Sequence, residues 1–329
     1  MRLNRTVSFS EIESYHKCRQ AWHYRYNEGL TPIDVGESLL VGSAVHYYLA
    51  EEIRGRVFNL PLTQTSWLSA NQDRYDDLFF SEMEEYLVEI DEVARKVAAR
   101  AADWLALGSS CGRWGPCYVN GKPAVEYEFV TKLKGTLGFK GVIDWIATDN
   151  TDDSLWIFEH KTHRTFTVED GADLLQLPIY QHAAKQLGLD IRGTAVLQIL
   201  PSLPERPKLN KNGTMSRAQI RSDWETYKTE LLSAGLDPDD YKDEMIPKLE
   251  GVEWFRLSKT IRSNAEIEAI WNMIFLPAVK DICDKRKRIV RSRSSFNCAR
   301  CDYRRLCEAE LFGGDVDFVR KTHYLERRS

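Results

Sequence analysis

Three residues near the middle of the chain have the types and spacing that hydrolytic chemistry needs. Asp144 and Glu159 stand in two apolar segments joined by a hairpin-length connection, so we expect them on neighbouring strands. Two carboxylates at the same height of a sheet form an oxygen-rich site suited to Mg²⁺ or Mn²⁺. Lys161 lies two positions beyond Glu159, roughly 6.5–7 Å along the same face of the strand. A lysine there can activate an attacking water or stabilise charge on a phosphate.

The same residues also allow a purely structural interpretation. Sheets commonly carry Glu–Lys ion pairs on their surface, and taken alone Glu159 and Lys161 favour such a pair. Alternation along the strand places His160 on the opposite face from Glu159, so we expect His160 to point away from the site. On the preceding strand, alternation places Val142, Asp144 and Ile146 on one face.

Four of the seven cysteines form a second constellation. Three lie close together as Cys298-x2-Cys301-x5-Cys307, and the fourth, Cys18, lies near the N-terminus. The start of the chain has no apolar signal-peptide core, and in a reducing compartment clustered cysteines favour a metal over disulfides. A triplet with one distant thiolate predicts a four-sulfur site that joins the two ends of the fold. Zinc is the alternative, although a second close cysteine pair is missing.

Composition sets the broad class. The chain has 329 residues, of which 43% are hydrophobic and 29% charged, as in an ordinary soluble protein. No apolar run approaches the roughly 20 residues that span a bilayer, so we expect a cytoplasmic protein without membrane contact. The net charge of −4 gives no overall case for nucleic acid. A basic run from Lys285 to Arg293 fits either a solvated helix end or a phosphate-contacting patch.

Periodicity indicates which elements hold these residues. Ser8 and Glu11 form a capping box that starts a helix, and one stripe of this helix carries Cys18. Further helices are predicted at about 43–54 with Gly55 as the stop, at 67–107, at 170–187, and after Ser263 up to the basic run. Strands are predicted at about 125–129, 142–146, 155–161 and 193–200, with loops at 108–121 and 201–216.

This pattern predicts an α/β fold in which a mixed β-sheet core is flanked by helices. We expect a helical N-terminal region at 1–107, a core with the β-sheet at 108–262 and a C-terminal region at 263–329. The first region carries Cys18 and His46, and the last carries the basic run and the cysteine triplet.

Several motifs together resemble a known enzyme family. Gly141-Val142-Ile143-Asp144, followed after fourteen residues by Glu159-His160-Lys161, resembles the signature of the PD-(D/E)XK nucleases, with Ile143 in place of the usual proline. It is more narrowly similar to the RecB-like branch, which includes CRISPR-associated iron–sulfur exonucleases and phage or bacterial recombination exonucleases. Matching motifs are the G-x-x-x-H helix start at 42–46, the Q-x-x-x-Y helix motif at 176–180, and the cysteines 18, 298, 301 and 307.

The resemblance implies a restriction-endonuclease-like core and specific roles. His46, Asp144 and Glu159 would bind Mg²⁺ or Mn²⁺, and Lys161 would position or activate the attacking water. Gln176 and Tyr180 lie four apart on one helix face and would orient Lys161 or a substrate phosphate. Pro178 implies a kink in that helix unless it falls in the first turn. The four cysteines would hold a 4Fe-4S cluster with a structural role.

The sequence therefore predicts a metal-dependent DNA exonuclease acting on single-stranded DNA or free ends. The setting would be recombination, repair or phage DNA processing, in the host cytoplasm if the protein is of phage origin. A recombination or annealing protein partner and a homo-oligomer are compatible with this function. The alternatives are a structure-specific endonuclease and a non-catalytic DNA-binding subunit of a recombination or CRISPR-adaptation complex. The chain has no Walker-type nucleotide-binding motif, so it carries no ATP motor of its own.

Overall fold

The computed structural model describes residues 3–63, 65–71, 77–107, 112–166, 174–249, 251–284 and 286–326, with only the backbone described at 77–82. A seven-stranded mixed sheet forms the centre, in the order β1-β7-β8-β9-β10, and β3 and β6 also pair with β7. Its strands are β1 Arg5–Ser8, β3 Trp114–Pro116, β6 Val125–Lys132, β7 Leu137–Asp149, β8 Ser154–Thr162, β9 Ile191–Ile199 and β10 Phe255–Thr260. The predicted mixed α/β architecture is confirmed.

The long strand β7 organises this sheet because different partners share each of its edges. One edge pairs with β6 and then β3. The other edge pairs with β1 over Leu137 to Lys140 and with β8 over Trp145 to Asp149. Among the described residues, the stretch 141–144 therefore has no ladder partner on the second edge, and the sheet opens there between β1 and β8. Asp144 lies at this opening.

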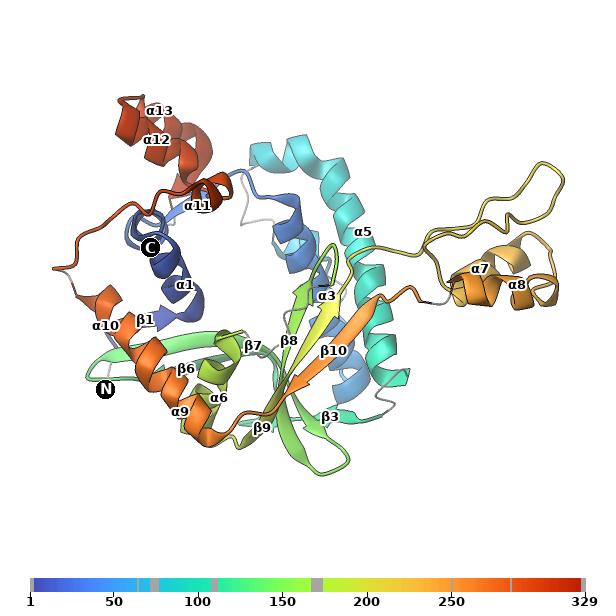
Figure 1. Ribbon diagram of the computed structural model, residues 1–329, viewed down its shortest axis with the longest axis horizontal. Helices are drawn as coiled ribbons and strands as arrows, with labels where there is room; N and C mark the ends of the chain where they lie inside the picture. Colours follow the sequence, from blue (N-terminus) through green and yellow to red (C-terminus); the bar gives the residue numbers. More distant parts are fainter. Residues whose placement is uncertain are drawn as a thin grey trace.

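Two layers of helices cover the sheet, one on each face (Figure 1). Helices α3 (Glu37–Phe58) and α5 (Asp77–Leu107) bury Trp145 and Phe158 on one face. The opposite face packs Ile146 and Ile157 against a second group of helices. This second group comprises α1 Phe9–Lys17, α6 Gln176–Gln186, α9 Asn264–Ile270, the π-helical turn Trp271–Phe275 and α10 Leu276–Cys283.

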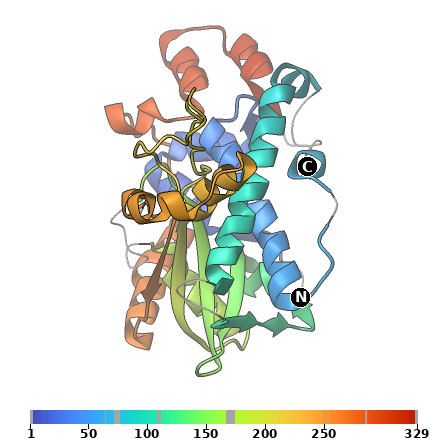
Figure 2. The same cartoon turned by 90° about the vertical axis from the view of Figure 1, so that its right-hand side faces the viewer.

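The remaining elements lie at the periphery. Helices α7 and α8 sit on an excursion between β9 and β10 that projects from the side of the molecule (Figures 1 and 2). Helices α11 to α13 lie beside the N-terminal helices. The bounds are α2 Arg19–Trp22, a π-helical turn His23–Asn27, α4 Trp67–Ala70, α7 Trp224–Ser233, α8 Asp239–Leu249, α11 Ser295–Ala299, α12 Arg304–Phe312, α13 Val316–His323, β2 Leu30–Pro32, β4 Tyr118–Val119, β5 Lys122–Pro123 and β11 Tyr324–Glu326.

Several predicted boundaries were wrong. The first helix does start at the Ser8 cap, with the Glu11 N–H donating to Ser8 Oγ at 3.2 Å, but it ends at Lys17. Cys18 is extended (φ −162°) and separates α1 from α2, so it does not lie on a continuous helical stripe. Helix α3 runs through Gly55 and stops at the left-handed Asn59, because tertiary packing outweighs the weak helix propensity of glycine.

Other elements differ in extent or were missed. The predicted loop at 108–121 contains β3 and β4, and its first residues, 108–111, lie outside the described part. Helix α6 starts at Gln176; of the earlier predicted start, 170–173 lie outside the described residues. The N-terminal region is not wholly helical, because β1 joins the central sheet. Within the described residues, no helix combines the length and apolar character needed to cross a membrane.

Candidate active site

The opening in the sheet leaves Asp144 free to accept a backbone hydrogen bond from β8. The ladder between β7 and β8 stops at the Trp145–Phe158 pair, and the next free N–H on β8 belongs to His160. This N–H donates to Asp144 Oδ2 at 2.7 Å, so the carboxylate completes the ladder in place of a backbone carbonyl. Regular alternation breaks here, because Ile143 and Ile146 belong to the same apolar cluster while Val142 is 40% exposed. The prediction that Val142, Asp144 and Ile146 share one face was therefore wrong.

Glu159 and Lys161 lie next to each other on β8. Lys161 Nζ is 2.6 Å from Glu159 Oε1, which is the ion pair that spacing favoured. Glu159, however, is only 4% exposed, so the pair is not an ordinary surface bridge. Gln176, the first residue of α6, donates from Nε2 to the other carboxylate oxygen, Oε2, at 3.3 Å. Glu159 is thus held from both sides, and Gln176 contacts Glu159 rather than Lys161.

Tyr180 reaches the same region from α6. A Cβ atom placed on Gly141 would lie 2.7 Å from the Tyr180 hydroxyl, so only glycine leaves room for this tyrosine against β7. The ring also packs edge-on against Phe129, with centroids 5.1 Å apart. Pro178 is in the first turn of α6, where its missing N–H costs no helix hydrogen bond, so no kink is required.

His46 enters from α3 on the other side of the opening. Its Nδ1 atom is 3.6 Å from Asp144 Oδ2. Helix α3 comes close to the end of β8 at Gly42, where a Cβ would lie 3.1 Å from Thr162 Oγ1. The predicted G-x-x-x-H start thus brings His46 to Asp144 by allowing close helix–strand approach.

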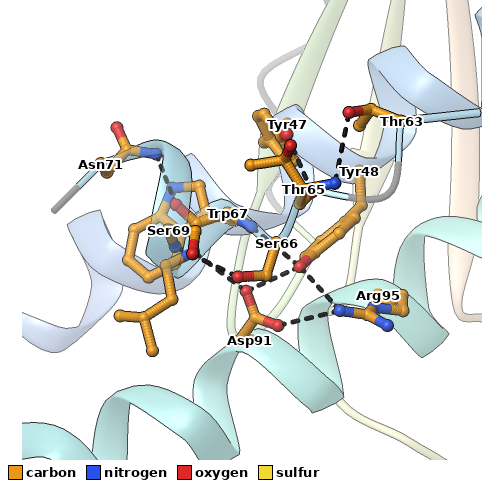
Figure 3. Close-up of polar contacts among 11 residues, drawn as sticks. Tyr47, Tyr48, Thr63, Thr65, Ser66, Trp67, Ser69, Asn71, Asp91 and Arg95 are labelled. Atoms are coloured by element: carbon orange, nitrogen blue, oxygen red, sulfur yellow. Dashed lines mark hydrogen bonds and ion pairs between the residues drawn. The ribbon is translucent and has the colours of Figure 1, made fainter.

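A polar network around Tyr48, two residues after His46 in the sequence, fixes α3 against α4 and α5 (Figure 3). The Tyr48 hydroxyl donates to Asp91 Oδ1 at 2.6 Å and accepts the N–H of Trp67 at 2.9 Å. Arg95 donates to both the Tyr48 hydroxyl and Asp91 at 3.2 Å. Because buried polar groups that are fully paired specify one packing arrangement, this network fixes the position of α3, the helix that carries His46.

His160 does not point away from the site, and the prediction that it would was wrong. Its Nδ1 atom is 3.8 Å from Asp144 Oδ2, and its ring lies 5.8 Å from that of His46, centroid to centroid. One ligand atom from each of His46, Asp144 and His160 lies within 4.8 Å of the others, which is a spacing that can hold a metal ion. The irregularity of β7 at Asp144, which strict alternation does not anticipate, accounts for the difference.

Burial dominates the electrostatics of these groups. It raises the pKa of Asp144 to about 6, although the His160 N–H and Lys161 oppose the shift. Burial, followed by the charge of Asp144, raises the pKa of Glu159 to about 7. Burial lowers the pKa of His46, and it lowers that of His160 well below the usual value, so both imidazoles are neutral near pH 7. Although burial opposes it, the Glu159 carboxylate keeps the pKa of Lys161 raised.

Two further carboxylates face the site. Glu126 on β6 has a left-handed φ of 48°, which is strained for a residue other than glycine, and burial followed by the Asp144 charge raises its pKa to about 8. Burial also raises the pKa of Glu13 on α1, whose carboxyl interacts with the charges of Lys161 and Glu159. Sequence reasoning missed Glu13, because no local pattern places α1 beside β8.

A large open cavity adjoins His46. Its walls come from α3, α4 and β6, and both Glu126 and Thr162 line it, so the neutral histidine faces solvent across this space. Buried carboxylates that prefer a proton, together with neutral imidazoles, form a donor set that a divalent cation would complete. The arrangement fits Mg²⁺ or Mn²⁺ with mixed oxygen and nitrogen ligands.

The four predicted sulfur ligands come together elsewhere. Cys18, Cys298, Cys301 and Cys307 all line one cavity between the N-terminal helices and α11–α12. Burial, with added contributions from Cys18 and Cys298, raises the pKa of the Cys301 thiol. The two ends of the chain are further joined by the Tyr24 hydroxyl, which donates to Glu310 at 2.6 Å.

The basic run follows α10 rather than forming its end. The helix stops at Cys283, and residues 286–294 have no regular structure; Lys285 lies outside the described residues. Arg286 pairs with Asp284, Lys287 with Asp281, and Arg291 with Glu310. Internal ion pairs therefore neutralise three cations of this run. The run is not a helix end, and only part of its charge remains for contacts with phosphates.

Comparison with known proteins points to one family. The model of the PD-(D/E)XK nuclease superfamily matches residues 6–308, a range that contains every candidate site residue from Cys18 to Cys307. Among curated proteins, none matches the sequence. A solved structure described as "Crystal structure of SSO0001" is 11% identical, with 92% of this chain and 98% of that chain covered and a TM-score of 0.28. A TM-score of that size supports no conclusion about this chain.

Proposed function

The chain belongs to the PD-(D/E)XK nuclease superfamily, and from this premise we propose that it is a metal-dependent DNA exonuclease of the RecB-like branch. The mixed sheet with flanking helices fits the restriction-endonuclease-like fold of that superfamily. The observation that carries the proposal is the convergence of Asp144, Glu159 and Lys161 at the opening between β1 and β8. A non-catalytic relative would have no need to keep a lysine paired to a buried carboxylate there.

His46, Asp144 and Glu159 would hold Mg²⁺ or Mn²⁺, and His160 is a further candidate ligand because its Nδ1 lies near the same Asp144 oxygen. Such an ion, when bound, would supply Lewis-acid stabilisation of the phosphate and ease deprotonation of water. The raised carboxylate pKa values match this role, since groups that are costly to ionise alone gain most from a cation.

Lys161 has the geometry of a positioning and charge-stabilising group. Its ammonium is held by Glu159 while the side chain remains 35% exposed, so it can also reach a substrate oxygen or water. Gln176 fixes the opposite oxygen of Glu159, which restricts the carboxylate to one orientation. Tyr180 is buried one turn further along α6, where its ring packs against Phe129.

Each of the three chain regions would contribute residues to the candidate active site or to the sulfur site. We propose that 1–107 supplies His46 and Cys18, that 108–262 forms the nuclease core, and that 263–329 completes the sulfur site. The four cysteines lining one cavity favour a 4Fe-4S cluster over zinc, because three close thiolates with one distant thiolate lack a second zinc knuckle. Its role would be to hold the chain ends together.

The biological setting that fits is DNA recombination, repair or phage DNA processing in the cytoplasm. A recombination or annealing protein, or a second copy of the chain, would be a compatible partner. The rival functions are a structure-specific endonuclease and a non-catalytic DNA-binding subunit.

One assay separates these functions. Linear single-stranded, linear double-stranded and circular DNA are incubated with Mg²⁺, Mn²⁺ or EDTA, with Lys161→Ala as the control. Release of nucleotides from linear DNA only, dependent on metal, is the expected result. Cleavage of circular DNA would identify an endonuclease. Absence of cleavage with every substrate and metal, in protein that binds Mn²⁺, would show a non-catalytic subunit.

A further inference from the structure

Residues 201–249 and 251–254 belong to an arm between β9 and β10 that projects beyond α5 (Figures 1 and 2). The arm has its own apolar core, made of Met215, Tyr227, Leu231, Tyr241, Met245 and Leu249. Its two ends meet, because the Leu200 N–H donates to the Trp254 carbonyl at 3.0 Å. The arm is therefore a small folded unit rather than an extended loop.

The base of the arm is fixed to the main body. Arg100 on α5 pairs with Asp223, the residue that caps α7, at 2.5 Å. Two guanidinium groups lie over the Trp254 ring, that of Arg100 at 5.0 Å and that of Arg221 at 5.1 Å from its centroid. These contacts combine charge with aromatic stacking, so they set the direction in which the arm projects.

Charge is strongly polarised within the arm. The stretch 206–222 has five cations, Arg206, Lys208, Lys211, Arg217 and Arg221, and no carboxylate, whereas the acidic residues gather on α7 and α8.

Two cations at the small hairpin of the arm, Lys208 and Lys211, have no carboxylate partner among the described residues. Arg206 and Arg217 are paired internally with Glu230 and Glu244. Lys208 and Lys211 are exposed and form no ion pair with any residue that the structure describes. Leu209 between them is 57% exposed at the start of the small hairpin closed by the Leu209–Met215 bridge.

The arm starts at the C-terminal ends of β8 and β9, where the candidate active site lies. Strands β8 and β9 are parallel, with Lys161 beside Gln198 and Thr162 beside Ile199, so the arm begins two residues beyond this level. A second cavity near the ends of these strands is lined by Ser38, Thr162, Arg164 and Arg221. Ser38 and Thr162 also line the cavity at His46. A continuous surface path therefore leads from His46 to the base of the arm.

We propose that the arm binds the sugar–phosphate backbone of substrate DNA outside the catalytic cleft. Lys208 and Lys211 would contact phosphates, and Leu209 would pack against a sugar or base, as apolar residues flanked by cations do in DNA-binding proteins. Arg221 continues the cationic surface towards the cleft. This inference rests on the proposed nuclease function for its choice of DNA as partner, but it concerns binding and needs no cleavage.

The test compares Lys208→Gln/Lys211→Gln with Lys228→Gln/Lys242→Gln, which removes the same charge from α7 and α8. Fluorescence anisotropy measures binding of labelled 8-nucleotide and 40-nucleotide DNA across a salt series, in the Lys161→Ala background. The first variant should bind the 40-mer about tenfold more weakly, with its salt slope reduced by roughly 1.4–1.8 for two lost phosphate contacts. Binding of the 8-mer should change less, because a shorter strand makes fewer phosphate contacts outside the cleft.

Three results would overturn the proposal: unchanged affinity and slope for the 40-mer, equal losses for both DNA lengths, or an equal loss in the control variant. The thermal midpoint should be the same in all proteins because the substituted lysines lie at the surface. If the unmodified protein cleaves no DNA yet loses 40-mer binding in the first variant, the nuclease proposal fails and the arm proposal stands. Normal cleavage with unchanged 40-mer binding would instead support the nuclease proposal and overturn the arm proposal.

Discussion

Asp144 Oδ2 accepts the backbone N–H of His160 at 2.7 Å, at the point where the ladder between β7 and β8 stops. One carboxylate therefore closes the sheet and presents the charge on which a metal site would depend. The same oxygen lies 3.6 Å from His46 Nδ1, so α3 is positioned against the same atom. Changes at this residue should separate a structural role from a chemical one.

Asp144→Asn and Asp144→Ala should differ in stability but not in activity. Asparagine keeps a neutral acceptor for the His160 N–H and removes a charge that is costly to bury, so its thermal midpoint should equal or exceed that of the unmodified protein. Alanine leaves a buried N–H unpaired, which costs about 1–3 kcal/mol. Both should lose Mn²⁺ binding in calorimetry and DNA cleavage. Cleavage at the normal rate by Asp144→Asn would contradict the assigned role.

Lys161→Ala should lower DNA cleavage by about 10²–10³-fold, the usual effect of losing one charge-stabilising group. DNA binding should change little, because phosphate contacts outside the cleft supply most of the affinity. Single-turnover cleavage and anisotropy measure the two quantities separately. Lys185→Ala, at the exposed end of α6, is the matched control and should keep full activity. A parallel loss of binding and cleavage in Lys161→Ala would mean that Lys161 acts in binding alone.

The metal-free protein should become less stable as pH rises from about 4 to about 7. Asp144 and Glu159 have folded-state pKa values raised to about 6 and about 7, so in this range the folded protein binds more protons than the unfolded chain. Stability then falls with increasing pH. Saturating Mn²⁺ should reverse this trend, because the cation binds the ionised carboxylates.

Thermal melts in EDTA and in Mn²⁺ from pH 5 to pH 9 measure the effect of pH on stability. The double variant Asp144→Asn/Glu159→Gln serves as the control and should show a flatter profile in EDTA. A metal-free midpoint that rises between pH 5 and pH 7 would show that other groups dominate the titration.

The sequence predicted much of the site because its residues lie in short local patterns. Hairpin spacing placed Asp144 and Glu159 on adjacent strands, and period-two alternation placed Glu159 and Lys161 together. The helix motif at Gln176 needed only a spacing of four residues to put two side chains on one face. Spacing within one strand or helix is set by that element alone, so these predictions depend little on tertiary structure.

The failures came where tertiary structure overrides local pattern. Alternation fails at Asp144 because β7 changes partners there, and His160 consequently comes near Asp144 instead of pointing away. Cys18 interrupts a regular apolar stripe because its extended backbone turns the thiol to the cysteines of the C-terminal region. Glu13 was missed because nothing in a sequence records that α1 packs near β8.

Tyr48→Phe should destabilise the protein without removing any candidate site residue. The hydroxyl bonds to Asp91, the Trp67 N–H and Arg95, so its loss leaves buried partners unpaired at a cost of about 1–3 kcal/mol. Denaturant unfolding measures this change. Metal affinity should fall as well, because a less firmly held α3 would also hold its His46 side chain less firmly. Tyr118→Phe, at an exposed tyrosine, is the control. Unchanged stability would show that the network is not needed to fix α3.

Protein purified without oxygen should be brown, with iron and sulfide each near roughly four per chain, if the four cysteines hold a 4Fe-4S cluster. Cys18→Ser should lose the colour, because this residue supplies the only thiol of the cavity from the N-terminal part that the structure describes. Visible absorption and metal analysis measure this outcome. Stoichiometric zinc without iron, in protein prepared anaerobically, would exclude the cluster but leave the nuclease site standing.

The same substitution should also lower stability. A site joining Cys18 to the C-terminal cysteines closes a loop of most of the chain, and cross-links over long loops remove much conformational freedom from the unfolded state. Cys283→Ser is the matched control, because Cys283 lies at the end of α10 and does not line the cavity. Less soluble protein and a lower thermal midpoint are expected for Cys18→Ser than for Cys283→Ser. Loss of colour with an unchanged midpoint would argue against a structural role and for a sensing role of the cluster.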